Sequence, residues 1–358
     1  MSYLIAAAGT GGHVFPGLAV GDALVEGGTD RDEVLFVGGD RLEQEVYPEA
    51  GFPFLRTKLA GLRRELSLEN LRLPQTIWRA SVEIGRAIAE HGVKVALGMG
   101  GYVTVPLAMA ARRRGVPLFL AEQNAAAGLA NRFAARWADR IFGSFPVTEG
   151  LPEAEWIGNP IRTPLRLFDR ARLRDEARRH FQLDDEGLVV GVIGGSLGAG
   201  ALNQVAALLA ASSPGYAILN LCGRGNLGEQ KQRAEASPAR WVVRGFEPRI
   251  ELFYAAVDAV VARAGGAVAE LTATATPAVL IPGGFGSGGH QEANASFLVA
   301  TGAALLLSED RLEESPAMVA ELLSSSSLSR MAEAAKTLAR PNAALDIAAA
   351  MRAAHEAM

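Results

Sequence analysis

The feature that most constrains this chain is a glycine-rich turn that occurs twice, each time between an apolar run and a helix-like segment. The first turn is Gly9-Thr10-Gly11-Gly12 and the second is Gly194-Gly195-Ser196-Leu197-Gly198. A strand, a glycine turn and a helix in this order are typical of the start of a doubly wound parallel sheet. Because the whole pattern restarts near residue 187, we expect two such domains.

Short apolar runs alternate with helix-period segments along the chain, which is typical of parallel sheets covered by helices on both faces. In the first half we expect a helix at 16–26 and strands at 3–8, 33–37, 95–99, 118–121 and 140–142. In the second half we expect a helix at 203–211 and strands at 188–193, 217–221, 241–244, 259–262, 278–281 and 304–307. The predicted fold class is α/β, with two Rossmann-like doubly wound domains.

A stretch with two prolines, Gly158-Asn159-Pro160-Ile161-Arg162-Thr163-Pro164, separates the two patterns and indicates a linker. We therefore expect an N-terminal domain at 1–161 and a C-terminal domain at 162–342. An alanine-rich helix at 343–358 follows. It can pack back across either domain, and we favour the N-terminal domain. The basic segment at 166–179 is predicted to be a helix whose charged side chains are solvated.

Composition excludes several classes of protein. The 358 residues are 49% hydrophobic with a net charge of -4, which excludes a disordered chain and argues against nucleic acid as a partner. The single cysteine, Cys222, excludes a disulfide framework and fits a reducing compartment. The longest apolar run, 95–111, is interrupted by glycines and Pro106, and the N-terminus lacks the basic region of a signal peptide. We expect a cytoplasmic protein without a membrane span.

In the first half, polar residues follow the expected strands at the sheet edge where open α/β folds bind ligands. His13 follows the first glycine turn and is either a general base for a hydroxyl or a loop-capping histidine. Val14 replaces the third glycine of the dinucleotide fingerprint, which weakens an NAD-binding interpretation although Asp40 can still contact a ribose. Glu122 and Asn124 follow another strand and either bind a ligand or cap the next helix.

In the second half, Gly194-Gly195-Ser196 can hold a diphosphate against backbone N–H groups. Glu270 lies near the start of the helix after a glycine turn and can accept both hydroxyls of a ribose. Gln291 and Asn294 are three residues apart, so they share a helix face and can bind sugar hydroxyls. Together these residues place the phosphates, ribose and sugar of a nucleotide sugar on one sheet edge.

Two charged patterns have competing interpretations. Asp30-Arg31-Asp32 has the form of a metal-binding string, but it precedes a strand, so we predict a surface turn and no metal site. Arg63-Arg64 and Arg112-Arg113-Arg114 flank Ile77 and Trp78 in the sequence. The favoured interpretation places Ile77 and Trp78 in the core of an ordinary helix. The alternative is an apolar and basic face on an anionic membrane surface.

In this order, the motifs resemble the bacterial MurG family of GT-B glycosyltransferases, and the resemblance covers nearly the whole chain. It rests on Gly9-Thr10-Gly11-Gly12-His13-Val14-Phe15-Pro16, Gly100-Gly101-Tyr102, Glu122-Gln123-Asn124, Gly158-Asn159-Pro160-Ile161-Arg162, Gly194-Gly195-Ser196, Arg263-Ala264-Gly265 and His290-Gln291 with Asn294. The resemblance implies a GT-B fold, in which two Rossmann-like domains face a cleft.

The resemblance implies a hexosyltransferase of peptidoglycan synthesis, and hence a role in cell-wall biogenesis, cell shape and division. It would transfer GlcNAc from UDP-GlcNAc, with inversion, to the C4 hydroxyl of the MurNAc of lipid I (undecaprenyl-diphospho-MurNAc-pentapeptide), giving lipid II. The donor would bind mainly to the C-terminal domain and lipid I to the N-terminal domain, on the inner face of the cytoplasmic membrane. The implied partners are UDP-GlcNAc, lipid I, the anionic membrane surface and other cell-wall synthesis proteins. No metal or other cofactor is implied.

Carried over residue by residue, the resemblance makes His13 the expected catalytic base, with Glu122 as the other candidate. It places the donor against Thr10, Gly11, Gly12, Asn124, Arg162, Ser196, Glu247, Gly265, Gly266, Ala267, Glu270, Gln291 and Asn294. Tyr102, Arg63 and Trp78 would lie on the acceptor and membrane side. The chain departs from the family in three places. Leu197 replaces a common glutamine, and Glu247 replaces an apolar residue whose backbone meets the uracil. The segment Arg263–Glu270 is one residue shorter than in some members.

Three other functions stay open on the sequence. A related GT-B enzyme with another lipid acceptor, such as a diacylglycerol, differs only on the acceptor side. A nucleotide-dependent oxidoreductase requires the fingerprint that Val14 interrupts. A non-catalytic nucleotide-sugar sensor would keep donor binding after loss of His13 and would have no turnover to lose.

Overall fold

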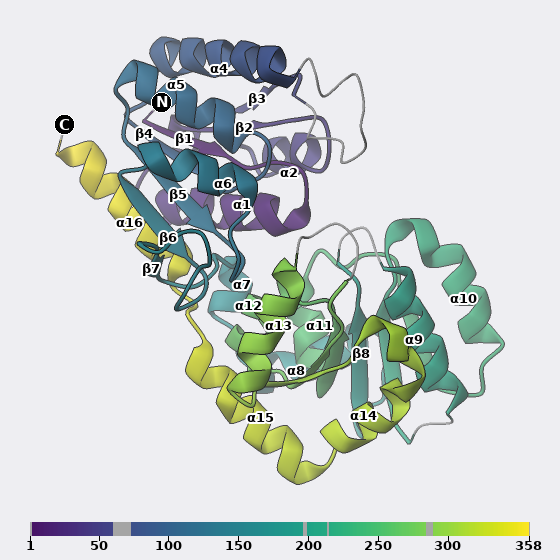
Figure 1. Ribbon diagram of the computed structural model, residues 1–358. Coiled ribbons are helices and arrows are strands. Elements are labelled where there is room, and N and C mark those ends of the chain that lie inside the picture. The colour runs from purple at the N-terminus through teal and green to yellow at the C-terminus, as the bar shows by residue number, and fades with distance from the viewer. Residues whose placement is uncertain (1, 60–72, 196–198, 213–214, 284–288, 358) are drawn as a thin grey trace. The chain divides into compact units, whose positions relative to one another are not determined.

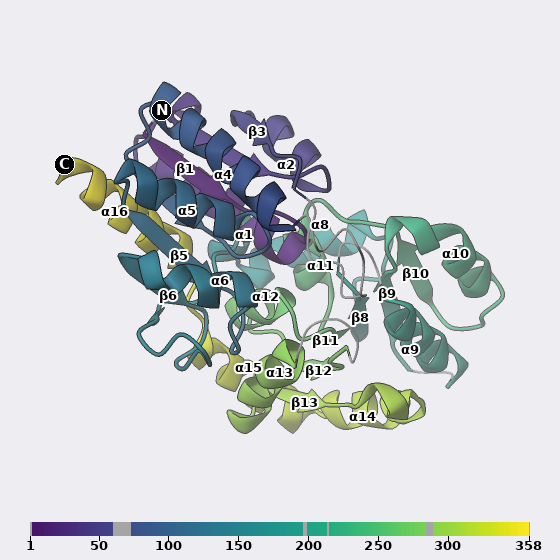
Figure 2. The ribbon, with the colours of Figure 1, turned by 45° about the horizontal axis from the view of Figure 1, so that its top comes forward.

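The computed structural model describes residues 2–59, 73–195, 199–212, 215–283 and 289–357. The chain forms two compact units, which we call unit 1 (Met1–Thr163 with Pro341–Met358) and unit 2 (Pro164–Arg340). Each unit is built on its own parallel sheet, and Figures 1 and 2 show helices on both faces of each sheet.

Unit 1 contains a seven-stranded sheet in the order β3-β2-β1-β4-β5-β6-β7. The strands are β1 (Tyr3–Ala6), β2 (Val34–Gly38), β3 (Phe54–Arg56), β4 (Val95–Gly98), β5 (Leu118–Glu122), β6 (Arg140–Gly143) and β7 (Glu155–Trp156). The helices described are α1 (Gly11–Glu26), η1 (Arg31–Glu33), α2 (Glu43–Glu49), α4 (Leu73–Glu90), α5 (Thr104–Arg114), α6 (Leu129–Ala134), η2 (Ala135–Trp137) and α16 (Ala343–Glu356). Every strand expected in the first half is confirmed, and Asp30-Arg31-Asp32 lies in the turn before β2, as predicted.

Successive side chains of each strand in unit 1 point to opposite faces of the sheet. On β1, Tyr3 and Ile5 lie in a core with α1 and α16, whereas Leu4 and Ala6 lie in a core with α4 and α5. Figure 2 shows α4, α5 and α6 along the same face. The last helix, α16, packs against α1, and the Arg352 guanidinium donates to the carbonyl of Gly27 at the end of α1. The C-terminal segment therefore completes unit 1.

Unit 2 contains a six-stranded sheet in the order β10-β9-β8-β11-β12-β13. The strands are β8 (Val189–Ile193), β9 (Ala217–Leu221), β10 (Trp241–Arg244), β11 (Ala259–Ala262), β12 (Ala278–Leu280) and β13 (Ala304–Leu306), which confirms the strands expected in the second half. The helices described are α7 (Thr163–Arg166, across the boundary), α8 (Arg170–His180), α9 (Gly200–Ala211), η3 (Arg224–Asn226), α10 (Leu227–Glu235), α11 (Ile250–Ala256), α12 (Ala267–Ala273), α13 (His290–Ala300), η4 (Glu309–Glu314), α14 (Ser315–Leu322) and α15 (Ser325–Leu338).

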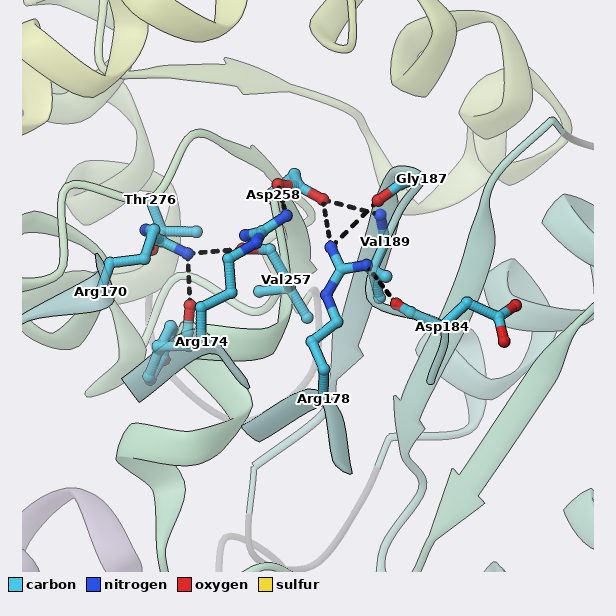
Figure 3. Close-up of polar contacts among 10 residues, drawn as sticks. Arg170, Arg174, Arg178, Asp184, Gly187, Val189, Val257, Asp258 and Thr276 are labelled. Carbon is cyan, nitrogen blue, oxygen red and sulfur yellow. Dashed lines mark hydrogen bonds and ion pairs between the residues drawn. The ribbon is translucent and has the colours of Figure 1, made fainter. Parts of the chain in front are cut away.

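The basic helix expected at 166–179 differs from the prediction. Asp169 accepts a hydrogen bond from the backbone N–H of Arg172 (3.1 Å), so the helix α8 begins at Arg170. One face of α8 is not solvated, because the Arg178 side chain is only 1% exposed and contacts the Asp258 carboxylate at 3.2 Å. Arg174 contacts the same carboxylate at 2.8 Å (Figure 3). The prediction of a solvated helix is therefore wrong for this face, where arginines four residues apart share a partly buried acid.

Candidate active site

In both sheets the strand order reverses at the first strand, between β1 and β4 in unit 1 and between β8 and β11 in unit 2. Open α/β sheets bind ligands beyond the carboxyl ends of the strands at this switch point. In unit 1, the loops at that point contain Gly9–Gly12 and Gly100–Tyr102. In unit 2, the loop after β11 contains Arg263–Gly266. The topology thus brings the two glycine-rich loops of unit 1 to one edge of their sheet, and places Arg263–Gly266 at the corresponding edge of the unit 2 sheet.

His13 lies in the first turn of α1, and its ring packs on the backbone of Gly100. A Cβ on Gly100 would be 3.0 Å from His13 Cδ2 and 3.1 Å from Nε2. Gly100 and Gly101 have φ angles of +87° and +75°, and a Cβ on Gly101 would be 2.7 Å from the Ala8 carbonyl oxygen. Only glycine fits both conformation and space at these positions. The glycine pair after β4 therefore shapes the seat of His13.

The surroundings of His13 favour its neutral form. Burial lowers the pKa of His13, while the carboxylates of Glu122 and Glu43 act in the opposite direction. The Thr10 hydroxyl lies 3.2 Å from His13 Nδ1 and orients the ring. When Nδ1 donates this hydrogen bond, the lone pair lies on Nε2, the nitrogen available to accept a proton. Gly11 and Gly12 begin α1, where the first N–H groups have no partner within the helix.

Glu122, at the end of β5, organises the loop that follows it. Its Oε1 accepts from the backbone N–H (3.1 Å) and side-chain amide (2.9 Å) of Asn124. Its Oε2 accepts from the N–H of Gly128 (3.1 Å) and the amide of Asn131 (2.8 Å). The residue is only 3% exposed. Glu122 and Asn124 lie together as expected. The capping interpretation of Glu122 explains the hydrogen bonds that both of its carboxylate oxygens accept.

Two residues that the sequence analysis missed complete this edge of unit 1. Asn131 on α6 is buried and also donates to the Ala121 carbonyl (3.0 Å), which ties α6 to β5. Glu43, at the start of α2, accepts from Tyr102 Oη at 3.0 Å. Tyr102 was expected on the acceptor side, and the structure places its hydroxyl on this internal carboxylate. The sequence offered one signal for Glu43, namely its position shortly after a strand. Its hydrogen bonds with other loops could not be inferred from that position.

In unit 2, Gly265 and Gly266 precede α12, which begins at Ala267 and carries Glu270 in its first turn. Tyr254 on α11 is 0% exposed, and its hydroxyl donates to Glu270 Oε2 at 2.8 Å. Sequence reasoning missed Tyr254, because its buried apolar neighbours make it indistinguishable from a core residue. The structure therefore fixes the orientation of Glu270 through a neighbouring helix.

Gln291 and Asn294 lie on α13 and hold the two loops next to it. Gln291 Oε1 accepts from the N–H of Gly283 (2.8 Å), after β12. The buried Asn294 donates through its amide to the Ala264 carbonyl (2.9 Å), after β11. The two amides thus lie at the predicted edge, where they also organise the glycine-rich loops.

Glu247 turns its side chain into unit 2. Its Oε2 lies 2.8 Å from His180 Nε2 on α8, and its Oε1 accepts from the N–H of Arg249 at 2.8 Å. Ser196 and Leu197 lie outside the described residues, as does Arg63. In unit 1, the Arg162 guanidinium lies 5.3 Å from the centre of the Phe15 ring, two residues beyond His13.

The structure contradicts the favoured interpretation that Trp78 is a core residue. Its side chain on α4 is 53% exposed, and the Arg113 guanidinium stacks on its ring at 4.6 Å from the centre. Ile77 is half-buried, because neighbouring residues of a helix point in directions about 100° apart. Among the described residues, no helix combines the length and apolar character that crossing a bilayer requires. The same part of the chain contains no group of three potential metal ligands.

Comparison with known proteins identifies the family. Residues 3–143 match the model of the glycosyltransferase family 28 N-terminal domain, and residues 189–351 match that of its C-terminal domain. The chain belongs to glycosyltransferase family 28. The two matches cover the unit 2 sheet and the unit 1 sheet except its short edge strand β7.

Relatives of this family 28 glycosyltransferase align over most of their length. A protein of Halorhodospira halophila is 40% identical over 95% of this chain and 94% of its own, and one of Mycobacterium sp. (strain KMS) is 38% identical over 90% and 86%. Both are named UDP-N-acetylglucosamine--N-acetylmuramyl-(pentapeptide) pyrophosphoryl-undecaprenol N-acetylglucosamine transferase. The crystal structure of Acinetobacter baumannii MurG has a TM-score of 0.77 and 27% identity, covering 99% of this chain and all of that one. The fold is the GT-B fold of MurG.

Proposed function

We propose that this glycosyltransferase transfers GlcNAc from UDP-GlcNAc to the C4 hydroxyl of the MurNAc of lipid I, with inversion, and forms lipid II. The names of its relatives support the substrates, since 40% identity extends over 95% of the chain. The observation that carries the mechanism is His13, a histidine held neutral by burial at the switch point of the first sheet. A neutral imidazole is the form that can accept a proton.

In the proposed step, His13 Nε2 takes the proton of the acceptor C4 hydroxyl as that oxygen attacks the anomeric carbon. The bond between the anomeric carbon and the diphosphate oxygen breaks, and UDP leaves with the electron pair. Thr10 orients the ring through its contact with Nδ1, and the proposed step uses the tautomer in which Nδ1 donates to the Thr10 hydroxyl. Glu122 is the less suitable base, because four donors already occupy its carboxylate. Its negative charge instead stabilises the imidazolium that forms.

On the donor side, we assign the ribose hydroxyls to Glu270, which Tyr254 orients. The backbone N–H groups of Gly265, Gly266 and Ala267, at the start of α12, face developing negative charge on the diphosphate without need of a metal. Since the Glu247 side chain has its own partners, its uracil contact belongs to the backbone. The remaining donor contacts are assigned to Thr10, Gly11, Gly12, Asn124, Arg162, Ser196, Gln291 and Asn294.

On the acceptor side, we assign the enzyme to the inner face of the cytoplasmic membrane. The exposed Trp78 and the last turn of α5, Arg112 to Arg114, form an aromatic and basic surface on neighbouring helices α4 and α5. Such surfaces bind anionic lipid headgroups. Tyr102 is assigned to the acceptor side through its place beside the Gly9 turn.

The decisive experiment is a transfer assay with radiolabelled UDP-GlcNAc and a short-chain lipid I analogue in the presence of EDTA. Labelled lipid II would establish donor, acceptor and metal independence together. In the same assay, His13→Ala should lower kcat by about 10²-fold or more, the usual scale for a general base, while UDP binding is retained.

Each negative result removes a different part of the proposal. Absence of product with UDP-GlcNAc still bound would point to another lipid acceptor, such as a diacylglycerol, or to a nucleotide-sugar sensor. Absence of both product and binding would contradict the donor assignment. Normal turnover of His13→Ala would remove the assignment of the base.

A further inference from the structure

Glu43, the first residue of α2, places a carboxylate in the interior of unit 1, with 0% of the residue exposed. Its Oε1 accepts from the N–H of Gly39 at 2.9 Å and from Tyr102 Oη at 3.0 Å. Its Oε2 accepts from the N–H of Gly9 at 3.3 Å. These donors follow β2, β4 and β1, and β1 lies between the other two strands. One carboxylate therefore joins three neighbouring loops at the carboxyl edge of the sheet.

The backbone around Glu43 is shaped for this arrangement. A Cβ on Gly39 would lie only 2.1 Å from Tyr102 Oη, so the hydroxyl fits there only because residue 39 is glycine. The Tyr102 ring also lies against Gly9, with Cε1 3.5 Å from the position that a Cβ would take. Burial and the Glu43 carboxylate raise the pKa of Tyr102 well above its ordinary value. The hydroxyl therefore stays protonated and donates to Glu43.

These contacts also affect the position of His13, because Gly9 lies four residues before it in the chain. Gly9 directly precedes Thr10, which occupies the N-cap position of α1 and whose hydroxyl lies 3.2 Å from His13 Nδ1. Fixing Gly9 thus fixes the start of the helix that carries the base. Within unit 1, the charged groups that act on His13 are Glu43 on α2 and Glu122 on β5. Asp40 and Arg41, in the loop before α2, act on Tyr102 with opposite signs.

We infer that Glu43 is a positioning residue for the glycosyl transfer: it holds the loop that carries His13, and its charge stabilises the imidazolium that forms as His13 takes the proton. This inference rests on the proposed function, which makes His13 the base. Glu43 itself is 0% exposed, so we assign it no direct contact with the substrate.

The test is Glu43→Gln in the transfer assay. A glutamine has the shape of the glutamate but only one acceptor oxygen, so an amide N–H₂ replaces either Oε2 facing Gly9 or Oε1 facing Gly39 and Tyr102. We expect kcat to fall by about 10- to 100-fold, because small displacements of catalytic groups cost this much. Loss of the negative charge disfavours the imidazolium and lowers the pKa of His13. The acid limb of the pH profile of kcat/KM should therefore move to lower pH.

The matched control is Glu45→Gln, which removes the same charge from an exposed position two residues further along α2. It should leave both kcat and the pH profile unchanged. Normal kcat in folded Glu43→Gln would overturn the inference, and so would a lower kcat with an unmoved acid limb. A wild-type enzyme that makes no product would instead contradict the proposed function.

Tyr102→Phe provides a second variant. It removes one of the three donors that hold the Glu43 carboxylate, so the carboxylate and the Gly9 loop are held less firmly near His13. The imidazolium then loses part of its stabilisation, and the acid limb should move to lower pH, by less than in Glu43→Gln. If circular dichroism shows that Glu43→Gln is not folded, Tyr102→Phe alone tests the inference. An unmoved acid limb in Tyr102→Phe then overturns it.

Discussion

Tyr254 and Glu270 show how one buried hydroxyl can set the affinity of the proposed donor site. Tyr254 is 0% exposed and donates to Glu270 Oε2 at 2.8 Å. We expect Tyr254→Phe to weaken UDP binding by about fivefold, because the net contribution of a hydrogen bond is about 1 kcal/mol. The measurement is isothermal titration calorimetry with UDP, and Glu270→Ala should weaken binding further.

The control for this prediction is a ligand without the contact. A 2′,3′-dideoxyuridine diphosphate lacks both ribose hydroxyls, so its affinity should be the same for wild type and Tyr254→Phe. An equal loss for both nucleotides would show that Tyr254 acts on the fold of unit 2 and not on the ribose contact.

At the residue scale, the sequence predicted where the polar residues lie better than it predicted their hydrogen-bond partners. His13, Glu122, Asn124, Gln291 and Asn294 could be found because residues after parallel strands must gather at one edge. Their hydrogen bonds could not be found, since these depend on which loops become neighbours in the sheet. Glu43 contacts loops that are far from it in the sequence, and no local pattern distinguishes such a glutamate from an exposed one.

At the scale of elements, apolar runs predicted the central strands, because a strand buried on both faces must be almost continuously hydrophobic. The edge strands β3 and β7 were missed, since they have only 3 and 2 residues and are partly exposed. The face of α8 was also missed. The sequence does not distinguish an arginine that contacts an acidic partner inside the unit from a solvated arginine. Asp258 lies 80 residues from Arg178, so no local pattern links the two.

The pair of Arg178 and Asp258 gives a stability prediction for α8. Asp258 accepts from Arg174, from Arg178 and from the N–H of Val189 at the start of β8 (2.8 Å). Asp258→Ala leaves Arg178 buried without its carboxylate, which costs about 3–5 kcal/mol. We expect a clear fall in the urea concentration at the unfolding midpoint of unit 2. The fluorescence of Trp241, which lies in the core of that unit, monitors this unfolding.

An exposed ion pair of unit 2 serves as the control for Asp258→Ala. Glu229 and Arg233 form an i,i+4 pair on α10 at 2.7 Å, with side chains 60% and 49% exposed. Glu229→Ala should change the stability by no more than about 0.5 kcal/mol. Comparable effects of the two substitutions would contradict the role of the buried acid.

At the scale of the whole molecule, the chain order alone did not determine which residues complete each unit. The helix α16 follows unit 2 in sequence but packs with α1, where Ala344, Ile347 and Met351 enter the core of unit 1. An alanine-rich helix has a narrow apolar face that can pack on many surfaces. On the sequence this helix could pack across either domain, and its contacts follow from the shape of the sheet that it covers.

The attachment of the whole molecule to a membrane depends, in our proposal, on Trp78 and its arginines. Basic residues near an anionic surface contribute about 1 kcal/mol each, so Trp78→Ala with Arg112→Gln and Arg114→Gln should lower binding to phosphatidylglycerol vesicles by at least about tenfold. Binding of the wild type should weaken with salt and on phosphatidylcholine vesicles. Cosedimentation measures both effects.

The control variant removes charge from α8, whose residues Arg170–His180 include no tryptophan. Arg172→Gln with Arg179→Gln neutralises two exposed arginines of α8 in unit 2 and should leave vesicle binding nearly unchanged. Turnover of a water-soluble acceptor should stay the same in the Trp78 variant, since Arg112 and Arg114 lie in the last turn of α5, whereas the loop that contacts His13 precedes its first turn. Equal losses of vesicle binding in both variants would mean that overall charge, and not this surface, holds the enzyme to lipid.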